Sequence, residues 1–255
     1  MPARWSYLDV PRPFGLAHRG AHGPGIAENS MAAFEAAVLL GFRHVETDVH
    51  ATADGALVAF HDPTLDRVTD SRGAIARLTW SEVSRARMTG AAQVPLLEHV
   101  LGTWPDLRVN IDVKDDRAVG PLLDVLRRTA AYHRVCIGAF SDRRIRHLRR
   151  VLPPGTATAM APLEVAALRI GRGPMTRLLP PEVPCVQVPV QFRRVRVVDE
   201  TFVHRAHQQS RQVHVWTINE EAEMRRLLAI GVDAIVTDNA ARLSEVLSSR
   251  SGGTA

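Results

Sequence analysis

Strand-like apolar runs alternate with helical patterns along almost the whole of this 255-residue chain. The predicted strands cover residues 14–20, 44–50, 108–114, 134–140, 156–161, 185–190, 212–218 and 234–238. The helical patterns lie near residues 29–40, 118–131, 142–151, 163–171, 199–209, 220–229 and 240–248. Alternation of this kind predicts an α/β protein with a parallel sheet, and eight strand–helix units predict closure into a (β/α)8 TIM barrel.

The length is consistent with a single domain. A barrel of this type needs ~250 residues, and no linker-like stretch divides the chain. We therefore predict one domain over residues 1–255, with a core at about 14–248 and a disordered tail at about 249–255. A doubly wound open sheet is the alternative, but no Gly-rich dinucleotide-binding loop follows the first predicted strand.

One stretch departs from this alternation. The runs at 44–51 and 56–62 are joined through Asp54-Gly55, which is a strong hairpin signal. Residues 62–93 then form a polar, Gly-containing stretch that is too long for a simple connection. It carries the pattern of a short helix at residues 81–86, with Ser81 as the predicted N-terminal cap.

The composition excludes several protein classes. Hydrophobic residues make up 45% of the chain and charged residues 23%, which is typical of a globular protein. The chain has neither an apolar run near the ~20 residues of a membrane-spanning helix nor a signal peptide, so we predict a cytoplasmic protein without stable membrane insertion. The net charge is +5, but the arginines are scattered and no nucleic-acid-binding motif is present, so no nucleic-acid partner is predicted. Cys136 and Cys185 lie in apolar runs and are expected to be buried free thiols.

The use of basic residues draws attention to one position. Of the 32 Lys and Arg residues, only Lys114 is a lysine. An ammonium is a compact, strongly hydrated point charge, whereas a guanidinium is a planar fork. The lone lysine therefore marks a position where a point charge is needed.

Polar side chains gather where three predicted strands end. His18 and Arg19 end the first strand, in Ala-His-Arg-Gly, and are suited to bind a phosphate. Glu46 and Asp48 end the second strand, and Asp112 and Lys114 end the third; within each pair a spacing of two places both side chains on one face. The carboxyl ends of barrel strands face the active site. Carboxylates this close repel one another unless a cation neutralises them, and all-oxygen ligands favour Mg²⁺ or Ca²⁺.

A second histidine is expected near the first. His61 follows the predicted hairpin, so its run can fold back over the mouth of the barrel toward His18. Two histidines beside a bound phosphate form an acid/base pair for cleavage of a P–O bond.

These motifs occur in the order of a known family. The relevant stretches are AHRG, ENSMAAFEAAVLLG, ETDVHATADGALVAFHDPTLDRVTDSRG, VNIDVK, VHVWTIN and GVDAIVTDN. Over roughly residues 14–248 they resemble the glycerophosphodiester phosphodiesterases. The resemblance implies metal-dependent hydrolysis of a glycerophosphodiester, in lipid and glycerol metabolism, to glycerol 3-phosphate and an alcohol.

The resemblance also implies roles for single residues. It makes His18 and His61 the catalytic acid/base pair, Arg19 and Lys114 the phosphate-binding residues, and Trp216 a wall of the substrate pocket. The metal ligands it implies are Glu46, Asp48 and Asp112. Residues 62–93 correspond to a small insertion between the second and third barrel units and are expected to cover the glycerol end of the substrate.

The chain departs from the family pattern at one ligand. Asp112 stands where the family usually has Glu, so its carboxylate is expected to lie farther from the metal or to reach it through water. Two other functions remain open. One is a lysophospholipase D or sphingomyelinase-D-like activity on the same barrel, and the other is a barrel that binds phosphodiesters without turning them over. Whether Gln187 and Gln191, near the end of the sixth strand, touch substrate is left open.

Overall fold

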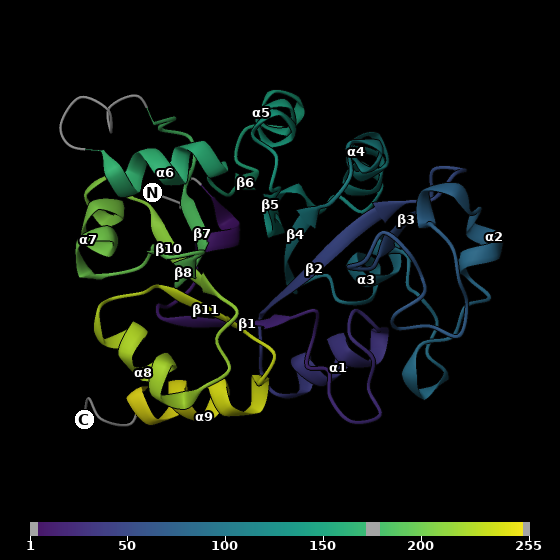
Figure 1. The fold of residues 1–255 in the computed structure, drawn as a ribbon, viewed down its shortest axis with the longest axis horizontal. Coiled ribbons are helices and arrows are strands. Elements are labelled where there is room, and N and C mark those ends of the chain that lie inside the picture. The colour runs from purple at the N-terminus through teal and green to yellow at the C-terminus, as the bar shows by residue number, and fades with distance from the viewer. Residues whose placement is uncertain (1–4, 172–178, 252–255) are drawn as a thin grey trace.

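The computed structural model describes residues 5–171 and 179–251 and contains the predicted barrel (Figure 1). Within these residues eight parallel strands lie side by side in the order β6 (Ala157–Thr158), β5 (Val135–Gly138), β4 (Arg108–Val113), β2 (His44–Ala51), β1 (Phe14–His18), β11 (Ala234–Thr237), β10 (Gln212–Trp216) and β7 (Cys185–Pro189). A parallel bridge between Ala159 and Cys185 links the two ends of this order. The prediction of a nearly closed TIM barrel is confirmed.

Helices surround the barrel, and within the described residues one follows each barrel strand (Figure 1). They are α1 (Met31–Leu39), α3 (Leu97–Thr103), α4 (Val119–Arg128), α5 (Asp142–Val151), α6 (Pro162–Ile170), α7 (Glu200–Gln208), α8 (Glu221–Ala229) and α9 (Ala240–Ser251). Short 3-10 turns are η1 (Ser6–Leu8), η2 (Ile75–Arg77), η3 (Thr89–Ala91), η4 (Asp116–Ala118) and η5 (Ala131–Arg134). No helix of the described ranges combines the length and the apolar character that a bilayer crossing requires.

The end of the chain differs from the prediction. Residues 249–251 continue helix α9 rather than beginning a disordered tail. The Ser249 hydroxyl donates to the carbonyl of Val246 and accepts from Arg225 of helix α8, so this turn is bonded to the body of the barrel. Residues 252–255 of the predicted tail lie outside the described residues.

The two faces of the strands have different surroundings. On β2, Val45 and Val49 are fully buried and belong to the large apolar cluster formed with the outer helices, as the alternation of residues predicts. The opposite face of the strands points into the barrel. There Tyr7 of η1 lies fully buried in a cluster with Cys136 and Cys185, whose sulfur atoms are 3.6 Å apart. Both cysteines are buried and free, as predicted.

Two buried histidines inside the barrel make its stability depend on pH. Burial lowers the pKa of His44 to about 3 and that of His214 to about 4. The His214 ring is fully buried, with Nδ1 3.3 Å from the Gln187 amide nitrogen and Nε2 3.2 Å from the Gln212 side-chain oxygen. Nδ1 therefore accepts and Nε2 donates, as in a neutral imidazole.

We expect the free energy of unfolding to fall as the pH drops from 6.5 toward 4. Below its ordinary pKa of ~6.5 the unfolded chain protonates these histidines while the folded chain does not, so each contributes a slope of up to about 1.4 kcal/mol per pH unit. Urea unfolding of the wild type and of His214→Gln at pH 7, 6 and 5 measures this. The variant should show the shallower slope; equal slopes would contradict the assignment of a neutral buried His214.

The expected hairpin is present, and short elements follow it in the segment 62–93. Strand β3 (Leu57–Ala59) pairs antiparallel with β2, as the Asp-Gly turn predicts. The following helix α2 (Trp80–Val83) begins after Thr79 rather than at Ser81, because the Glu82 carboxylate accepts from the backbone N–H and hydroxyl of Thr79. Val83 of this helix belongs to a small separate core with Val58 of β3 and with Phe60, Leu65, Ile75 and Met88.

Helix α3 was not among the helices predicted from the sequence. It has only seven residues and directly follows an apolar stretch, so its periodicity is hard to detect. The buried guanidinium of Arg134 donates to the carbonyls of Leu101, Trp104 and Leu107 at its end. Since α3 is the helix of the second unit, the segment 62–93 lies within that unit, between its strand and its helix.

Candidate active site

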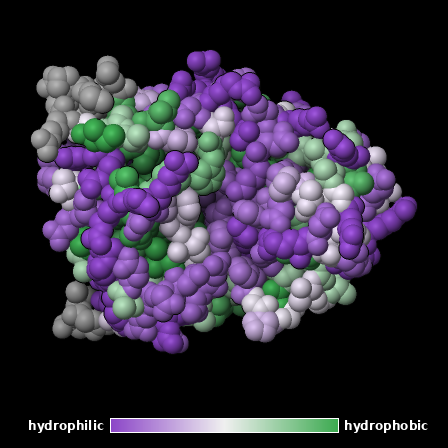
Figure 2. Space-filling view, in the orientation of Figure 1, coloured by the Kyte–Doolittle hydropathy of each residue, from purple (hydrophilic) through white to green (hydrophobic). Residues whose placement is uncertain are grey.

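The register of the strands brings the predicted site residues together. His18 lies beside Glu46 across the β1–β2 pair, and Asp48 lies beside Asp112 across the β2–β4 pair. On the other side of β1, Ala17 pairs with Thr237, so Asp238 follows directly beside His18. His18 and Asp112 stand at or near the carboxyl ends of β1 and β4, Asp238 follows β11, and Glu46 and Asp48 lie beside them on β2, at the end of the barrel that carries an active site. Figures 1 and 2 look onto the barrel, and hydrophilic side chains surround the hollow at its centre.

Three carboxylates lie buried beside the unique lysine. Glu46, Asp48 and Asp112 are each at most 8% exposed. The Lys114 ammonium is 2.8 Å from Asp48 Oδ1 and 2.6 Å from Asp112 Oδ2. These two carboxylates raise the pKa of Lys114 against the opposing effect of burial, so it remains an ammonium.

The same three acids differ in their protonation tendencies. Burial and the neighbouring charges of Asp48 and Asp112 raise the pKa of Glu46 well above its usual range. Burial also raises the pKa of Asp112. For Asp48 the attraction of Lys114 and Arg19 outweighs burial, and its pKa is lowered. The three carboxylates would therefore carry more negative charge than the neighbouring Lys114 and Arg19 neutralise.

The chemistry of the three carboxylates suits a divalent cation, although among the described residues their oxygens do not all lie within 4.8 Å of one another. Asp48 Oδ2 and Asp112 Oδ1 are buried, and neither accepts a hydrogen bond from the described part of the chain. Buried carboxylate oxygens are almost always satisfied, so two such atoms in one cluster point to a ligand. Oxygen ligands from three carboxylates are suited to Mg²⁺ or Ca²⁺. Asp112 thus offers one oxygen to Lys114 and keeps the other free despite its shorter side chain.

His18 is held by a chain of hydrogen bonds from the last strand. Its Nδ1 is 2.6 Å from Asp238 Oδ1, and its Nε2 lies 3.7 Å from Glu46 Oε2. Asn219 donates to the other oxygen of Asp238 at 2.9 Å and accepts from the Asp238 backbone N–H. Although burial opposes it, hydrogen bonding from His18, His22 and Asn219 lowers the pKa of Asp238. An ionised Asp238 fixes the His18 ring with Nδ1 protonated and Nε2 facing the acid cluster.

His22 shares this carboxylate. Its Nε2 is 3.1 Å from the same Asp238 oxygen that His18 approaches. His18, His22 and Asp238 together have the composition of a metal site. However, both ring nitrogens already lie at hydrogen-bonding distance from that oxygen, so a metal would have to displace protons that now bridge these groups. We therefore assign this group to orienting His18.

His61 has a matching arrangement on the other side. Its Nδ1 is 2.6 Å from Asp62 Oδ1, and its backbone carbonyl lies 3.0 Å from His50 Nε2. Hydrogen bonds from Arg67, opposed by burial and aided by His61, lower the pKa of Asp62 to about 2. Each predicted catalytic histidine is thus oriented through Nδ1 by an aspartate.

Arg19 stands in a sharp turn directly after β1. Its φ is 54° and that of Gly20 is 80°, both in the left-handed region. The Arg19 backbone N–H donates to Glu46 Oε2 at 3.2 Å, its guanidinium contacts Glu28 at 2.9 Å, and its Nε lies 3.3 Å from Asp48. The turn therefore directs both the backbone and the side chain of Arg19 toward the carboxylates.

Gly20→Ala should lower the free energy of unfolding by about 2–4 kcal/mol. Alanine would be strained at this φ, and its Cβ would lie 2.6 Å from the backbone carbonyl carbon of Ala33. The control is Gly120→Ala in helix α4, where nothing lies within 4 Å of the added Cβ. That variant should be as stable as the wild type or more stable by up to about 1 kcal/mol. Urea unfolding of both variants measures these free energies. Wild-type stability of Gly20→Ala would contradict the predicted strain at this position.

Three other residues considered in the sequence, Trp216, Gln187 and Gln191, occupy three different places. Trp216 ends β10 at the mouth, where its ring packs edge-to-face on Phe140 at 5.7 Å, and Lys114 lies 5.5 Å from the same Phe140 ring. Gln187 points into the barrel and donates to Asn110 at 2.8 Å. Gln191 is exposed on the hairpin of β8 (Gln191–Phe192) and β9 (Val195–Arg196), where it donates to the carbonyl of Arg193.

Sequence reasoning missed several members of this site, namely His22, Glu28, Asp62, Arg67, Asn219 and Asp238. Asp238 had a detectable signal, because it follows the last strand at its carboxyl end. The others stand in loops, where position along the chain indicates no partner.

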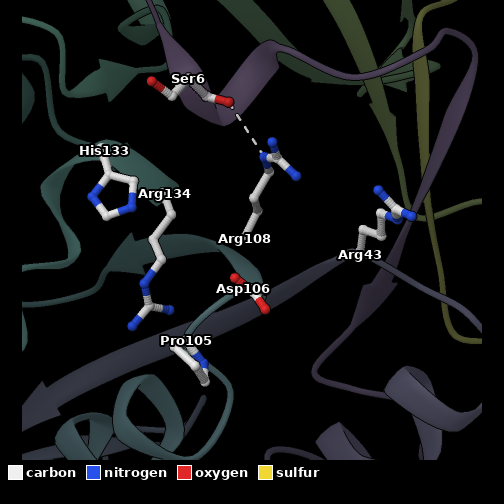
Figure 3. Close-up of a pocket in the computed structure, with 7 residues that line it drawn as sticks. All are labelled: Ser6, Arg43, Pro105, Asp106, Arg108, His133 and Arg134. Atoms are coloured by element: carbon white, nitrogen blue, oxygen red, sulfur yellow. Dashed lines mark hydrogen bonds between the residues drawn. The ribbon is translucent and has the colours of Figure 1, made fainter.

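A separate hollow of about 520 Å³ lies at the opposite, amino-terminal end of the barrel (Figure 3). It is lined by Ser6, Arg43, Pro105, Asp106, Arg108, His133 and Arg134. Two of its arginines are already engaged: Arg108 with the carbonyls of Ser6 and Asp9, Arg134 with helix α3. None of the predicted site residues lines this hollow, so the candidate active site is the mouth at the carboxyl ends.

Known proteins resemble this chain over most of its length. A sequence model of the Glycerophosphoryl diester phosphodiesterase family matches residues 18–242. The Mycobacterium tuberculosis protein named "Probable glycerophosphodiester phosphodiesterase 2" is 39% identical over 241 residues, covering 92% of this chain and 90% of that protein. "Lysophospholipase D GDPD1" of Rattus norvegicus is 26% identical over 275 residues, covering 92% of this chain and 86% of that protein.

A solved structure shares the fold. It is an Oleispira antarctica phosphodiesterase in complex with the product sn-glycerol-3-phosphate. The TM-score is 0.76 at 20% identity, covering 93% of this chain and 97% of that chain. At this level of identity the likeness concerns the fold, and the chemistry has to be argued from the site.

Proposed function

Because the chain belongs to the glycerophosphoryl diester phosphodiesterase family, we propose that it hydrolyses glycerophosphodiesters to glycerol 3-phosphate and an alcohol. The observation that carries this proposal is one mouth holding three buried carboxylates, an ammonium, a guanidinium and two aspartate-oriented histidines. A titratable set of this kind in one concave site is typical of a catalytic centre.

The acid cluster would hold the cofactor. Glu46, Asp48 and Asp112 would bind Mg²⁺ or Ca²⁺ through their carboxylate oxygens, two of which lack a described hydrogen-bond donor. Lewis-acid polarisation of a phosphate oxygen is the chemistry that such a cation supplies when bound.

Arg19 and Lys114 would bind the phosphate. Both already contact Asp48, at 3.3 and 2.8 Å, so their positive charges face the same point of the mouth. Positive groups that are fixed before the reaction stabilise charge developing on the phosphoryl oxygens without reorganising. Trp216 and Phe140 would form the wall beside them.

His18 and His61 would move the protons. In each ring Nδ1 is bound to an aspartate, which leaves Nε2 for the substrate. One imidazole would take the proton of the nucleophile, which is water or the neighbouring glycerol hydroxyl. As the P–O bond to the alcohol breaks, the other imidazolium would give its proton to the departing oxygen. The first route yields glycerol 3-phosphate directly, and the second passes through a cyclic phosphate that water then opens.

A lysophospholipase D or sphingomyelinase-D-like activity is the second candidate. It is favoured by the Rattus norvegicus relative and by Phe140, which is 66% exposed at the mouth. The hydrophilic surroundings of the central hollow in Figure 2 favour a small polar substrate instead. A non-catalytic phosphodiester-binding barrel ranks third, because the set of groups needed for catalysis is complete. We further propose a cytoplasmic enzyme without a nucleic-acid partner.

The test is release of glycerol 3-phosphate from glycerophosphocholine, glycerophosphoethanolamine and glycerophosphoglycerol. Each is assayed with Mg²⁺, with Ca²⁺ and with excess EDTA, beside His18→Ala. Release that is lost with EDTA and in the variant supports the proposal and ranks the head groups. Choline release from lysophosphatidylcholine but not from glycerophosphocholine would favour the second candidate, and no release from any substrate would favour a binding protein.

A further inference from the structure

We propose that Arg67 is a positioning residue that orients both His61 and Arg19 through two carboxylates. The inference rests on the proposed function, which assigns proton transfer to His61 and phosphate binding to Arg19. Arg67 itself belongs to the segment 62–93 and touches neither the acid cluster nor Lys114 through any contact that the described residues show.

The first half of the arrangement leads to His61. The Arg67 guanidinium approaches Asp62 with two nitrogens, Nε at 2.5 Å from Oδ2 and Nη2 at 3.1 Å from Oδ1. Asp62 Oδ1 in turn lies 2.6 Å from His61 Nδ1. A two-point contact fixes the plane of the carboxylate, and the carboxylate then fixes the plane and tautomer of the imidazole.

The second half leads to Arg19. Nη2 of Arg67 also lies 2.6 Å from Glu28 Oε1, and Nη1 lies 3.3 Å from Oε2. The same Glu28 oxygen accepts from Arg19 Nη1 at 2.9 Å. Glu28 thus stands between two guanidinium groups, one in the segment 62–93 and one at the end of β1.

The geometry explains why one guanidinium binds both Glu28 and Asp62. Glu28 precedes helix α1 and Asp62 follows strand β3, so two loops remote in sequence place their carboxylates on one cation. A planar fork can make a two-point contact with each of two carboxylates, whereas an ammonium has no such pair of parallel donors. Without Arg67, Glu28 would keep only its described contact with Arg19 and Asp62 only its described contact with His61, and each carboxylate would lose the two contacts from Arg67 that now fix its orientation.

The exposure of the three side chains separates positioning from stability. Arg67 is 49% exposed, whereas Glu28 and Asp62 are 16% and 19% exposed. An ion pair with a half-exposed partner contributes little to folding because water and salt screen it. Its loss should therefore affect catalysis while leaving the folded state nearly as stable as before.

The experiment compares Arg67→Met and Arg67→Lys with the wild type, using glycerophosphocholine as substrate at saturating Mg²⁺. Arg67→Met should lower kcat by about 10- to 100-fold, the usual effect of removing a residue that orients a catalytic group. It should also raise KM, because Glu28 is no longer fixed by Arg67 and holds Arg19 less firmly in place. Arg67→Lys should retain part of kcat, since it keeps the charge but not the two-point contact.

The matched control is Arg226→Met. Arg226 makes a similar two-point contact with Glu223 on helix α8, at 2.6 and 2.7 Å, and is 40% exposed. This variant should keep wild-type kcat and KM, with a similarly small change in Tm. If Arg67→Met matches it in kcat and KM, Arg67 does not position the site.

A second readout does not depend on turnover. The His61 Nδ1 proton in its short contact with Asp62 should give a downfield NMR signal, assigned by its absence in His61→Gln. Arg67→Met should broaden or shift that signal, and Arg226→Met should not. An unchanged signal in Arg67→Met overturns the inference, whereas a wild type without activity but with this difference would overturn the proposed function alone.

Discussion

Replacing His18 or His61 by alanine should lower kcat by about 10²- to 10⁴-fold, which is the usual contribution of a general acid or base. Each ring is held through Nδ1 at 2.6 Å from an aspartate oxygen, so each presents Nε2 in a defined direction. The two side chains are 17% and 34% exposed, and their removal leaves no large cavity in the core. The fold should therefore remain intact, as circular dichroism and thermal unfolding would show.

The control is His147→Ala on helix α5, an exposed histidine outside the mouth. It should retain wild-type kcat. Asp238→Asn keeps the size of the group that orients His18. Its kcat should lie between those of His147→Ala and His18→Ala, because an amide no longer stabilises an imidazolium. Near wild-type turnover in both His18→Ala and His61→Ala would contradict the acid/base assignment.

Removing divalent cations with EDTA should lower turnover by roughly 10³-fold, since a bound cation supplies several kcal/mol of transition-state stabilisation and each ~1.4 kcal/mol is a factor of ten. Asp48→Asn should have a similar effect by weakening the cation site, by more than about 100-fold. Asp48 is 2% exposed, and its Oδ2 accepts no described hydrogen bond and has only the Arg19 guanidinium 3.3 Å away, so we expect this carboxylate to bind the cation.

Two further measurements make this test specific. Mg²⁺ or Ca²⁺ should raise the Tm of the wild type but not of Asp48→Asn, because a ligand that binds only the folded state stabilises it. Asp124→Asn, on the exposed face of helix α4, should behave as the wild type in both assays. Asp112→Glu should lower the cation concentration needed for half-maximal activity by lengthening the shorter ligand. Full activity in excess EDTA would contradict a catalytic role for the cation.

The barrel was predictable because its strands are buried and its helices are periodic. In the run 109–113, Val, Ile and Val alternate with Asn and Asp, and this period of two predicts a strand without any knowledge of its neighbours. Where elements are short, local pattern fails. Helix α3 has seven residues, and its end is bonded to Arg134 from a later part of the chain. The start of α2 after Thr79 depends on two hydrogen bonds from Thr79 to the Glu82 carboxylate.

Part of the candidate site was also predictable, for a related reason. Glu46 with Asp48, and Asp112 with Lys114, are two residues apart on a strand, and a strand turns every second side chain to one face. Because the active site of a TIM barrel lies at the carboxyl ends of its strands, both pairs are predicted to lie at the same mouth. The side-by-side position of Asp48 and Asp112 confirms that they meet there.

The sequence by itself determined the eight units, the face on which each strand-end pair lies and the residue types that suit a phosphate and a cation. These properties follow from backbone periodicity and side-chain chemistry, which act over a few residues. Only the tertiary structure decided that Asp238 orients His18 from 220 positions away, and that Arg67 joins Asp62 to Glu28. Such partners depend on strand order and on how loops pack. Hydrogen bonds and ion pairs form between groups a few ångströms apart in space, whatever their separation in the sequence.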